Sequence, residues 1–170
     1  MAARKGFLRL KATFPSFDNP SPYNIVVQRP TSAYYAIETC LEFTPAAQYQ
    51  QAGLIVREFQ TGYGAAIGFE QTNEKLLKVW HTASDGTKEM AQLRYDDRRV
   101  YLRIEVEGPI FKCFYSADNV AWKALGPAYY YPFRSGYFTT FHPGLFAGET
   151  VETKTECWAD FDYFHFKDFE

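Results

Sequence analysis

The sequence predicts an all-β domain, a two-sheet antiparallel β-sandwich of the jelly-roll type. Short segments of alternating apolar and polar residues recur about every eight to twelve residues, with turn residues between them. Segments with the period of a helix are nearly absent, and only Pro45–Gln51 resembles a short helical turn. Because 170 residues are enough for one domain and few for two, residues 1–170 are expected to form a single sandwich.

The elements of the first half follow in chain order. Phe7–Lys11 is a short alternating strand, and the loop Ser16–Pro22, rich in proline and serine, separates it from the extended segment Tyr23–Gln28. The next strand places Tyr35, Ile37, Leu41 and Phe43 on one face and Glu38 and Glu42 on the other. Four further strands are predicted, separated by turn residues such as Gln60-Thr61-Gly62 and Ser84-Asp85-Gly86. They are Gln51–Phe59, Tyr63–Glu70 and Lys75–Thr82, followed by Lys88–Tyr95.

The clearest element is the hairpin Arg98–Ser116. Its first half alternates apolar residues with charged residues and one tyrosine, Gly108-Pro109 breaks the run, and the second half alternates again. This pattern is typical of strands that pack on a second sheet and expose their other face to water or to a ligand. After it come Trp122–Leu125, an aromatic-rich loop over Pro127–Gly136, and the strands Pro143–Gly148 and Trp158–Phe166.

Charge and hydropathy exclude two classes of partner. The net charge is −2, and the basic residues form no cluster beyond Arg4-Lys5 and Arg98-Arg99, so a nucleic-acid partner is not expected. No apolar run is long enough to span a bilayer, and no membrane partner is expected. The N-terminus has no signal-peptide core, so an extracellular location requires that the chain be a mature form or a piece of a longer protein.

The three cysteines, Cys40, Cys113 and Cys157, predict no metal centre. They are far apart, and no Cys/His spacing typical of zinc is present. Cys113 falls on the apolar face of its strand, where a buried free thiol is expected. At most one disulfide is possible, and the sequence does not choose its members.

An ordered set of motifs resembles a known family. The set resembles the concanavalin A-like β-sandwich at the C-terminus of family 43 glycoside hydrolases, the β-xylosidase and arabinofuranosidase group, over most of Gly6–Phe166. In order, the motifs are GFLRL (Gly6–Leu10), Gln28-Arg29-Pro30, YYAIETCLEFTP (Tyr34–Pro45), Gln51-Ala52-Gly53-Leu54, VYLRIEVEG (Val100–Gly108), FYSADNVAWKALG (Phe114–Gly126), GLFAG (Gly144–Gly148) and ADFDYFHF (Ala159–Phe166).

The resemblance implies an accessory role. In that family the catalytic acids lie in a separate five-bladed propeller, so the resemblance implies a non-catalytic module that recognises xylan-type polysaccharide and has a catalytic glycosidase domain as its partner. It also implies that the sandwich packs on the propeller and lends an aromatic side chain to the rim of the active site. The segment that resembles this loop is 138–143, which makes Phe138 and His142 candidates.

Sugar binding by a sandwich needs flat aromatic rings that face solvent, together with polar groups for the hydroxyls. Trp80 is the leading candidate, because alternation in its strand places it with Lys78 and opposite Val79. Tyr101 and Arg103 share the outward face of the long hairpin; the alternative is a solvated face without a ligand. The adjacent rings Tyr129, Tyr130 and Tyr131 are candidates because three neighbouring rings cannot all enter one core. Trp122, by contrast, is expected to anchor the core.

Acidic residues raise three further possibilities. Asp160 and Asp162, two residues apart on the last strand, are expected either to tie down loops with their carboxylates or to hold a structural Ca²⁺ through carboxylate oxygens. A catalytic pair is the weaker interpretation, because the two carboxylates follow one strand instead of facing each other across a bond. A small jelly-roll glycanase that uses Glu58, Glu105 or Glu107 is the rival enzyme hypothesis. Apart from the acidic residues, the other alternative is a purely structural domain that supports a propeller.

Overall fold

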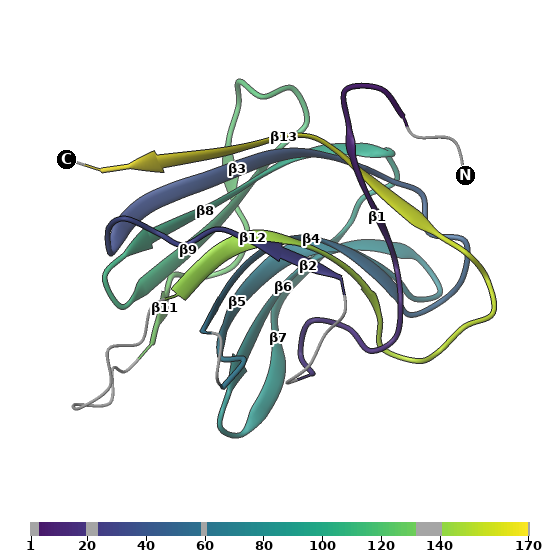
Figure 1. Ribbon diagram of the computed structural model, residues 1–170, viewed down its shortest axis with the longest axis horizontal. Coiled ribbons are helices and arrows are strands. Elements are labelled where there is room, and N and C mark those ends of the chain that lie inside the picture. The colour runs from purple at the N-terminus through teal and green to yellow at the C-terminus, as the bar shows by residue number, and fades with distance from the viewer. Residues whose placement is uncertain (1–3, 20–23, 59–60, 132–140, 170) are drawn as a thin grey trace.

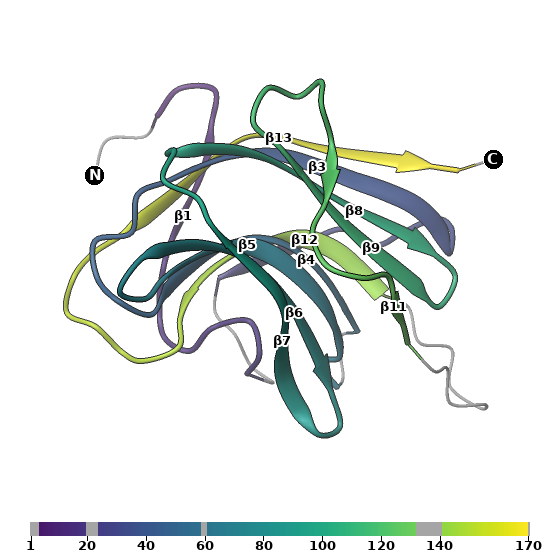
Figure 2. The same cartoon turned by 180° about the vertical axis from the view of Figure 1, so that it is seen from behind.

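The computed structural model describes residues 4–19, 24–58, 61–131 and 141–169. Two antiparallel sheets stack face to face and arch in the same direction (Figure 1; Figure 2 shows the reverse side). One sheet has the order β1-β13-β3-β8-β9-β10, with β11 also paired to β9, and the other has the order β2-β12-β4-β5-β6-β7. The two-sheet sandwich predicted from the alternation is therefore confirmed.

The strand bounds agree with the predicted segments to within a few residues, except that β11 lies in Pro127–Gly136, which was predicted to be a loop. The strands of the described residues are β1 (Leu8–Lys11), β2 (Ile25–Val27), β3 (Tyr34–Phe43), β4 (Gln50–Glu58), β5 (Gly64–Gln71), β6 (Lys75–Ala83), β7 (Gly86–Arg94), β8 (Arg99–Glu107), β9 (Ile110–Ser116), β10 (Lys123–Ala124), β11 (Tyr129–Tyr130), β12 (Phe141–Glu149) and β13 (Trp158–Asp168). The short turn suggested at Pro45–Gln51 forms as a bend and a turn over residues 46–49, not as a helix, and leads into β4.

Alternating residues of the two inner faces form the main core. Leu102 and Ile104 of β8 face Leu54 of β4 and Ile67 of β5, and all four side chains are fully buried. Burial of each such side chain contributes about 1.5–3 kcal/mol of hydrophobic free energy. Cys40, Cys113 and Cys157 are free and buried, so the expectation of a buried thiol at Cys113 is confirmed. Across the described ranges, no helix is both long and apolar enough to cross a bilayer.

A second, smaller apolar cluster lies on the outer face of the six-stranded sheet. Segment 12–19 leaves β1 and passes beneath the arch of this sheet (Figure 1). Its Phe17 ring packs against Trp80 of β6 and Phe146 of β12, with ring centroids 5.5 and 4.6 Å away. The Ser16 hydroxyl donates a 2.5 Å hydrogen bond to Gln51 on the same face. The loop therefore closes part of a surface that strand alternation alone leaves open.

Candidate functional site

The outer face of the seven-stranded sheet brings two of the predicted residues together. Tyr101 and Arg103 lie two residues apart on β8, and both point away from the core, as alternation predicted. The Arg103 guanidinium donates to Glu38 of β3 at 2.7 Å and lies 3.8 Å from Glu105 on its own strand. A carboxylate on each side therefore fixes the position of Arg103.

Trp122 completes this face, although the sequence had placed it in the core. The Arg103 guanidinium carbon lies 4.0 Å from the centroid of the Trp122 ring, a cation–π contact. Trp122 is half-buried and does not enter the core between the sheets, so the prediction of a core anchor was wrong. We call Tyr101, Arg103, Trp122 and Glu38 the outer-face platform.

The loop before Trp122 is built to hold the ring in place. The Asp118 carboxylate accepts hydrogen bonds from the backbone N–H groups of Val120 and Ala121, each at 2.9 Å, and from the Ser116 hydroxyl at 2.9 Å. These bonds lower the pKa of Asp118 and favour its charged form at neutral pH. Asn119 takes the left-handed backbone conformation, with φ of 63°. The S-x-D-N turn signal could have identified a loop that projects Trp122 over β8.

A carboxylate cluster borders the platform on the same face. Glu42 of β3 and Asp160 of β13 are buried and lie opposite each other in the sheet. Arg9 donates to Asp160 at 2.6 Å, Arg99 donates to Glu42 at 2.6 Å, and Arg4 contacts both carboxylates at 3.0 and 2.7 Å. These contacts lower the pKa of both acids, that of Glu42 to about 2, with the Arg4 hydrogen bond as the largest cause for Glu42 and the Arg9 hydrogen bond for Asp160.

The cluster makes stability depend on pH. Since the folded-state pKa values of Glu42 and Asp160 lie below their ordinary values, the unfolded chain binds more protons in acid. The contribution of these two carboxylates to the free energy of unfolding is complete above about pH 5 and is lost as the pH falls toward 2. We expect the melting temperature measured by circular dichroism to fall steadily from pH 5 to pH 3. A melting temperature that is constant over this interval would contradict the assignment.

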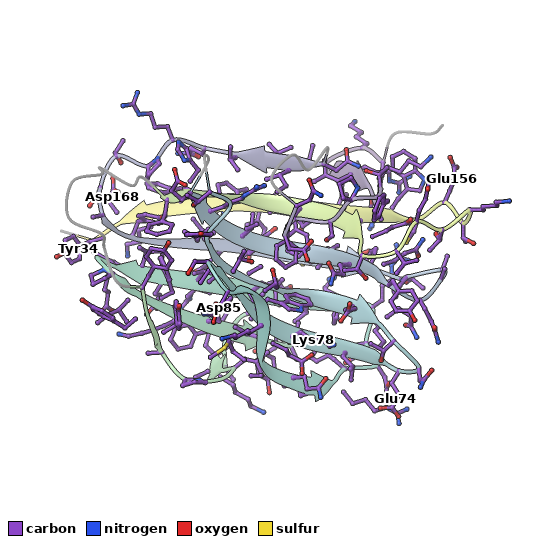
Figure 3. The ribbon with its side chains drawn as sticks, turned by 90° about the horizontal axis from the view of Figure 1, so that it is seen from below. Tyr34, Glu74, Lys78, Asp85, Glu156 and Asp168 are labelled. Carbon is purple, nitrogen blue, oxygen red and sulfur yellow. The ribbon has the colours of Figure 1, made fainter. Side chains whose placement is uncertain are left out.

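Trp80 points outward, as predicted, but its ring is not accessible. The side chain lies on the outer face of the six-stranded sheet, where Phe17 and Phe146 cover it and leave 5% exposed. The prediction of an open stacking surface at Trp80 is therefore wrong in this structure. Lys78 shares that face (Figure 3) and forms ion pairs with Glu70 at 2.6 Å and Glu89 at 2.7 Å.

Tyr129 and Tyr130 form β11, and Tyr131 follows it, at one end of the sandwich (Figure 1). Tyr131 is buried with Phe111 and Phe141, Tyr129 packs edge-on against His81, and Tyr130 is exposed. The three adjacent rings therefore diverge, as their spacing required. His142 is half-buried on β12 beside Arg57 of β4, and Phe138 lies outside the described residues. The predicted carbohydrate-binding residues thus fall into three separate places.

The acidic residues do not assemble into a metal or glycanase site. The Arg4 and Arg9 side chains bind the Asp160 carboxylate, whereas Asp162 is exposed and lies between Phe161 and Phe164, where the pairing register of β13 shifts. Within the described ranges, no three His, Cys, Asp or Glu side chains are grouped so that they could hold a metal ion. Glu58 belongs to β4 of one sheet, and Glu105 and Glu107 belong to β8 of the other, so these acids do not face each other across a groove.

Comparison with known families and structures gives a consistent result. Residues 1–167 match the family model described as the beta xylosidase C-terminal concanavalin A-like domain. The chain is 29% identical over 176 residues to a xylan 1,3-beta-xylosidase of a Vibrio species and 27% identical over 189 residues to a putative beta-xylosidase of Escherichia coli K12. Each alignment covers 98% of this chain, and the chain spans about a third (32% and 33%) of the length of these relatives.

Solved structures share the fold. A family 43 glycoside hydrolase from Bacillus licheniformis superposes with a TM-score of 0.87 at 22% identity, over 98% of this chain and 34% of that one. A xylan beta-1,4-xylosidase from Bacillus halodurans superposes with a TM-score of 0.83 at 22% identity, over 97% of this chain and 33% of that one. At these identities the likeness concerns the fold of the sandwich.

Proposed function

Because the chain belongs to the C-terminal concanavalin A-like domain family of the β-xylosidases, we propose that it is a non-catalytic accessory module that binds xylan-type polysaccharide on its outer-face platform. The observation that carries the proposal is the contact of Arg103 with both Trp122 and Glu38. It supplies an aromatic ring of fixed orientation beside charged groups that can bond sugar hydroxyls. The neighbouring Tyr101 extends this surface along the same strand.

The relatives support the polysaccharide class and the partner. Both curated relatives are named as xylosidases, and this chain corresponds to about a third of their length. A catalytic glycosidase domain is therefore the proposed partner, and the sandwich would hold substrate near it, outside the cell. The separation of Glu58 from Glu105 and Glu107 onto different sheets argues against hydrolysis by this domain itself.

Affinity for a short ligand should be modest. Stacking on one aromatic ring contributes about 0.5–1.5 kcal/mol beyond the area that it buries, and a flexible oligosaccharide loses freedom on binding. We expect dissociation constants on the order of micromolar to millimolar for xylohexaose. Binding to the polymer should be tighter where several platforms or several chain segments engage at once.

Trp122→Ala tests the proposal. Removal of the ring should weaken binding of xylohexaose about tenfold, the change that corresponds to roughly 1.4 kcal/mol. Isothermal titration calorimetry measures the affinity, and retardation in gels that contain soluble xylan gives a second readout. Val120→Ala is the matched control, because Val120 is 81% exposed in the same loop and does not belong to the platform.

Three results would contradict the proposal. Equal affinities of the Trp122→Ala and Val120→Ala proteins would remove the platform from the binding site. A wild-type protein that binds no glycan would favour the purely structural domain. Release of reducing sugar that is lost in Glu105→Gln or Glu58→Gln would favour the small glycanase.

A further inference from the structure

A cleft that is separate from the outer-face platform lies at one end of the sandwich. It has a volume of about 400 Å³ and runs between residues 11–14, at the end of β1, and residues 149–156, the loop between β12 and β13. Figure 3 places Glu156 of this loop at the end of the molecule opposite Tyr34 and Asp168. None of the residues of the outer-face platform lines it.

Hydrogen bonds hold both walls of the cleft. The buried carboxylate of Glu149 accepts from the backbone N–H and the hydroxyl of Thr153, each at 2.8 Å, and from Gln50 Nε2 at 2.9 Å. Gln50 Nε2 also donates to the Thr155 carbonyl at 2.8 Å. On the other wall, the Thr13 carbonyl accepts from the Glu149 N–H at 3.0 Å, and Asn24 donates to the Thr13 hydroxyl at 2.5 Å. The cleft is therefore formed before a ligand arrives.

The lining combines one open aromatic ring with many small polar groups. The Phe14 side chain is 48% exposed, so part of its ring is open to a ligand in the cleft. Two lysines, three threonines and three glutamates line the rest of the cleft, together with Ala12. Lys11 and Glu156 pair across it. Since cations and anions nearly balance, the cleft does not favour a polyanion or a polycation.

We propose that this cleft is a second carbohydrate-binding site, which takes a short stretch of a neutral glycan. The apolar face of one pyranose ring would stack on Phe14, and its hydroxyls would bond to the threonine, lysine and glutamate side chains of the 149–156 loop. A volume of about 400 Å³ lies at the lower end of the range for ligand pockets, which limits the occupant to a few sugar units. The site does not depend on Trp122, so each site can be tested alone.

Two sites on one small domain would change how the module holds a polymer. When one chain of polysaccharide reaches both sites, the second contact forms at a high effective concentration. Loss of either site should then weaken binding to soluble xylan more than it weakens binding to xylohexaose. This behaviour distinguishes a module with two coupled binding sites from one that binds sugar on the platform but not in the cleft.

The test is a titration of the whole chain with xylohexaose, followed by backbone amide NMR. Thr153 and Thr155 should shift in a saturable way in the wild type and equally in Trp122→Ala. In Phe14→Ala the shifts should require at least about tenfold more ligand, the equivalent of roughly 1.4 kcal/mol. Tyr34→Ala is the control, because Tyr34 is an aromatic residue with 54% exposure at the opposite end of the sandwich.

A double substitution keeps the test decisive if Phe14→Ala disturbs folding. Glu152→Gln with Lys154→Gln changes two exposed side chains of the same cleft, and should weaken the Thr153 and Thr155 response severalfold. The proposal is overturned if these amides do not shift in the wild type, or if they shift at the same ligand concentration in the cleft variants. Loss of the shifts in Trp122→Ala as well would also overturn it, because the cleft would then not be an independent site.

Discussion

Gly53→Ala is expected to lower the free energy of unfolding by about 3 kcal/mol or more, at the upper end of the cost of overpacking a core. Gly53 of β4 lies directly opposite Gly68 of β5. A Cβ atom at Gly53 would lie 2.1 Å from the Ile67 carbonyl oxygen and 2.6 Å from the Gly68 Cα. Both obstacles are backbone atoms of a central strand, so no side-chain rotation relieves the clash and the two strands must separate.

Urea denaturation with Gly86→Ala as the control measures this effect. Gly86 begins β7 at a turn, has φ of +102°, and has nothing within 4 Å of an added Cβ. Gly86→Ala should lower the free energy of unfolding by about 1 kcal/mol, because alanine is strained in a backbone conformation that glycine prefers. Equal losses in the two variants would show that the close approach of β4 and β5 at Gly53 costs no more than the strained backbone at Gly86, which would contradict the account.

Glu42→Gln is expected to destabilise the domain by about 2 kcal/mol. This value is smaller than the 3–5 kcal/mol typical of a broken buried ion pair, because solvent screens the partly exposed arginines. The change removes the negative charge that binds Arg4 and Arg99 and leaves their guanidinium groups around a neutral amide. The variant should also lose less stability than the wild type between pH 5 and pH 3, since the group that titrates is gone.

Glu38→Gln is the matched control for Glu42→Gln. Glu38 lies on the same face of the same strand, but among the described residues its ion pair is with Arg103, and it is more exposed than Glu42. Its loss should cost less than about 1 kcal/mol, as for exposed ion pairs. Denaturation midpoints that rank Glu38→Gln as the more damaging change would show that the cluster around Glu42 is not the main ionic contribution on this face.

Alternation predicted the β8–β9 hairpin best because these strands are buried on one face only, whereas β4, β5 and β12 are buried on both faces. The hairpin Arg98–Ser116 is confirmed as β8 and β9, and its charged residues and Tyr101 face outward. Tyr101 and Arg103 were placed correctly for the same reason. The short turn predicted at Pro45–Gln51 is present before β4 as a bend and a turn without a helix.

The other errors arise from contacts between segments that are distant in sequence. Alternation gives the face of Trp80 correctly, but nothing in β6 shows that Phe17, sixty-three residues earlier, covers the ring. Likewise, nothing near Asp160 shows that Arg4 and Arg9 occupy its carboxylate. Trp122 was assigned to the core on the usual burial of tryptophan, whereas the turn held by Asp118 directs it onto Arg103.

The most direct test of the outer-face platform is an NMR titration that follows the indole N–H signals of the three tryptophans, Trp80, Trp122 and Trp158, as xylohexaose is added. We predict a saturable shift of the Trp122 signal and no shift of Trp80, which Phe17 and Phe146 cover. A Trp122 signal that stays unchanged at millimolar ligand, whatever the other two do, would contradict sugar binding on this face.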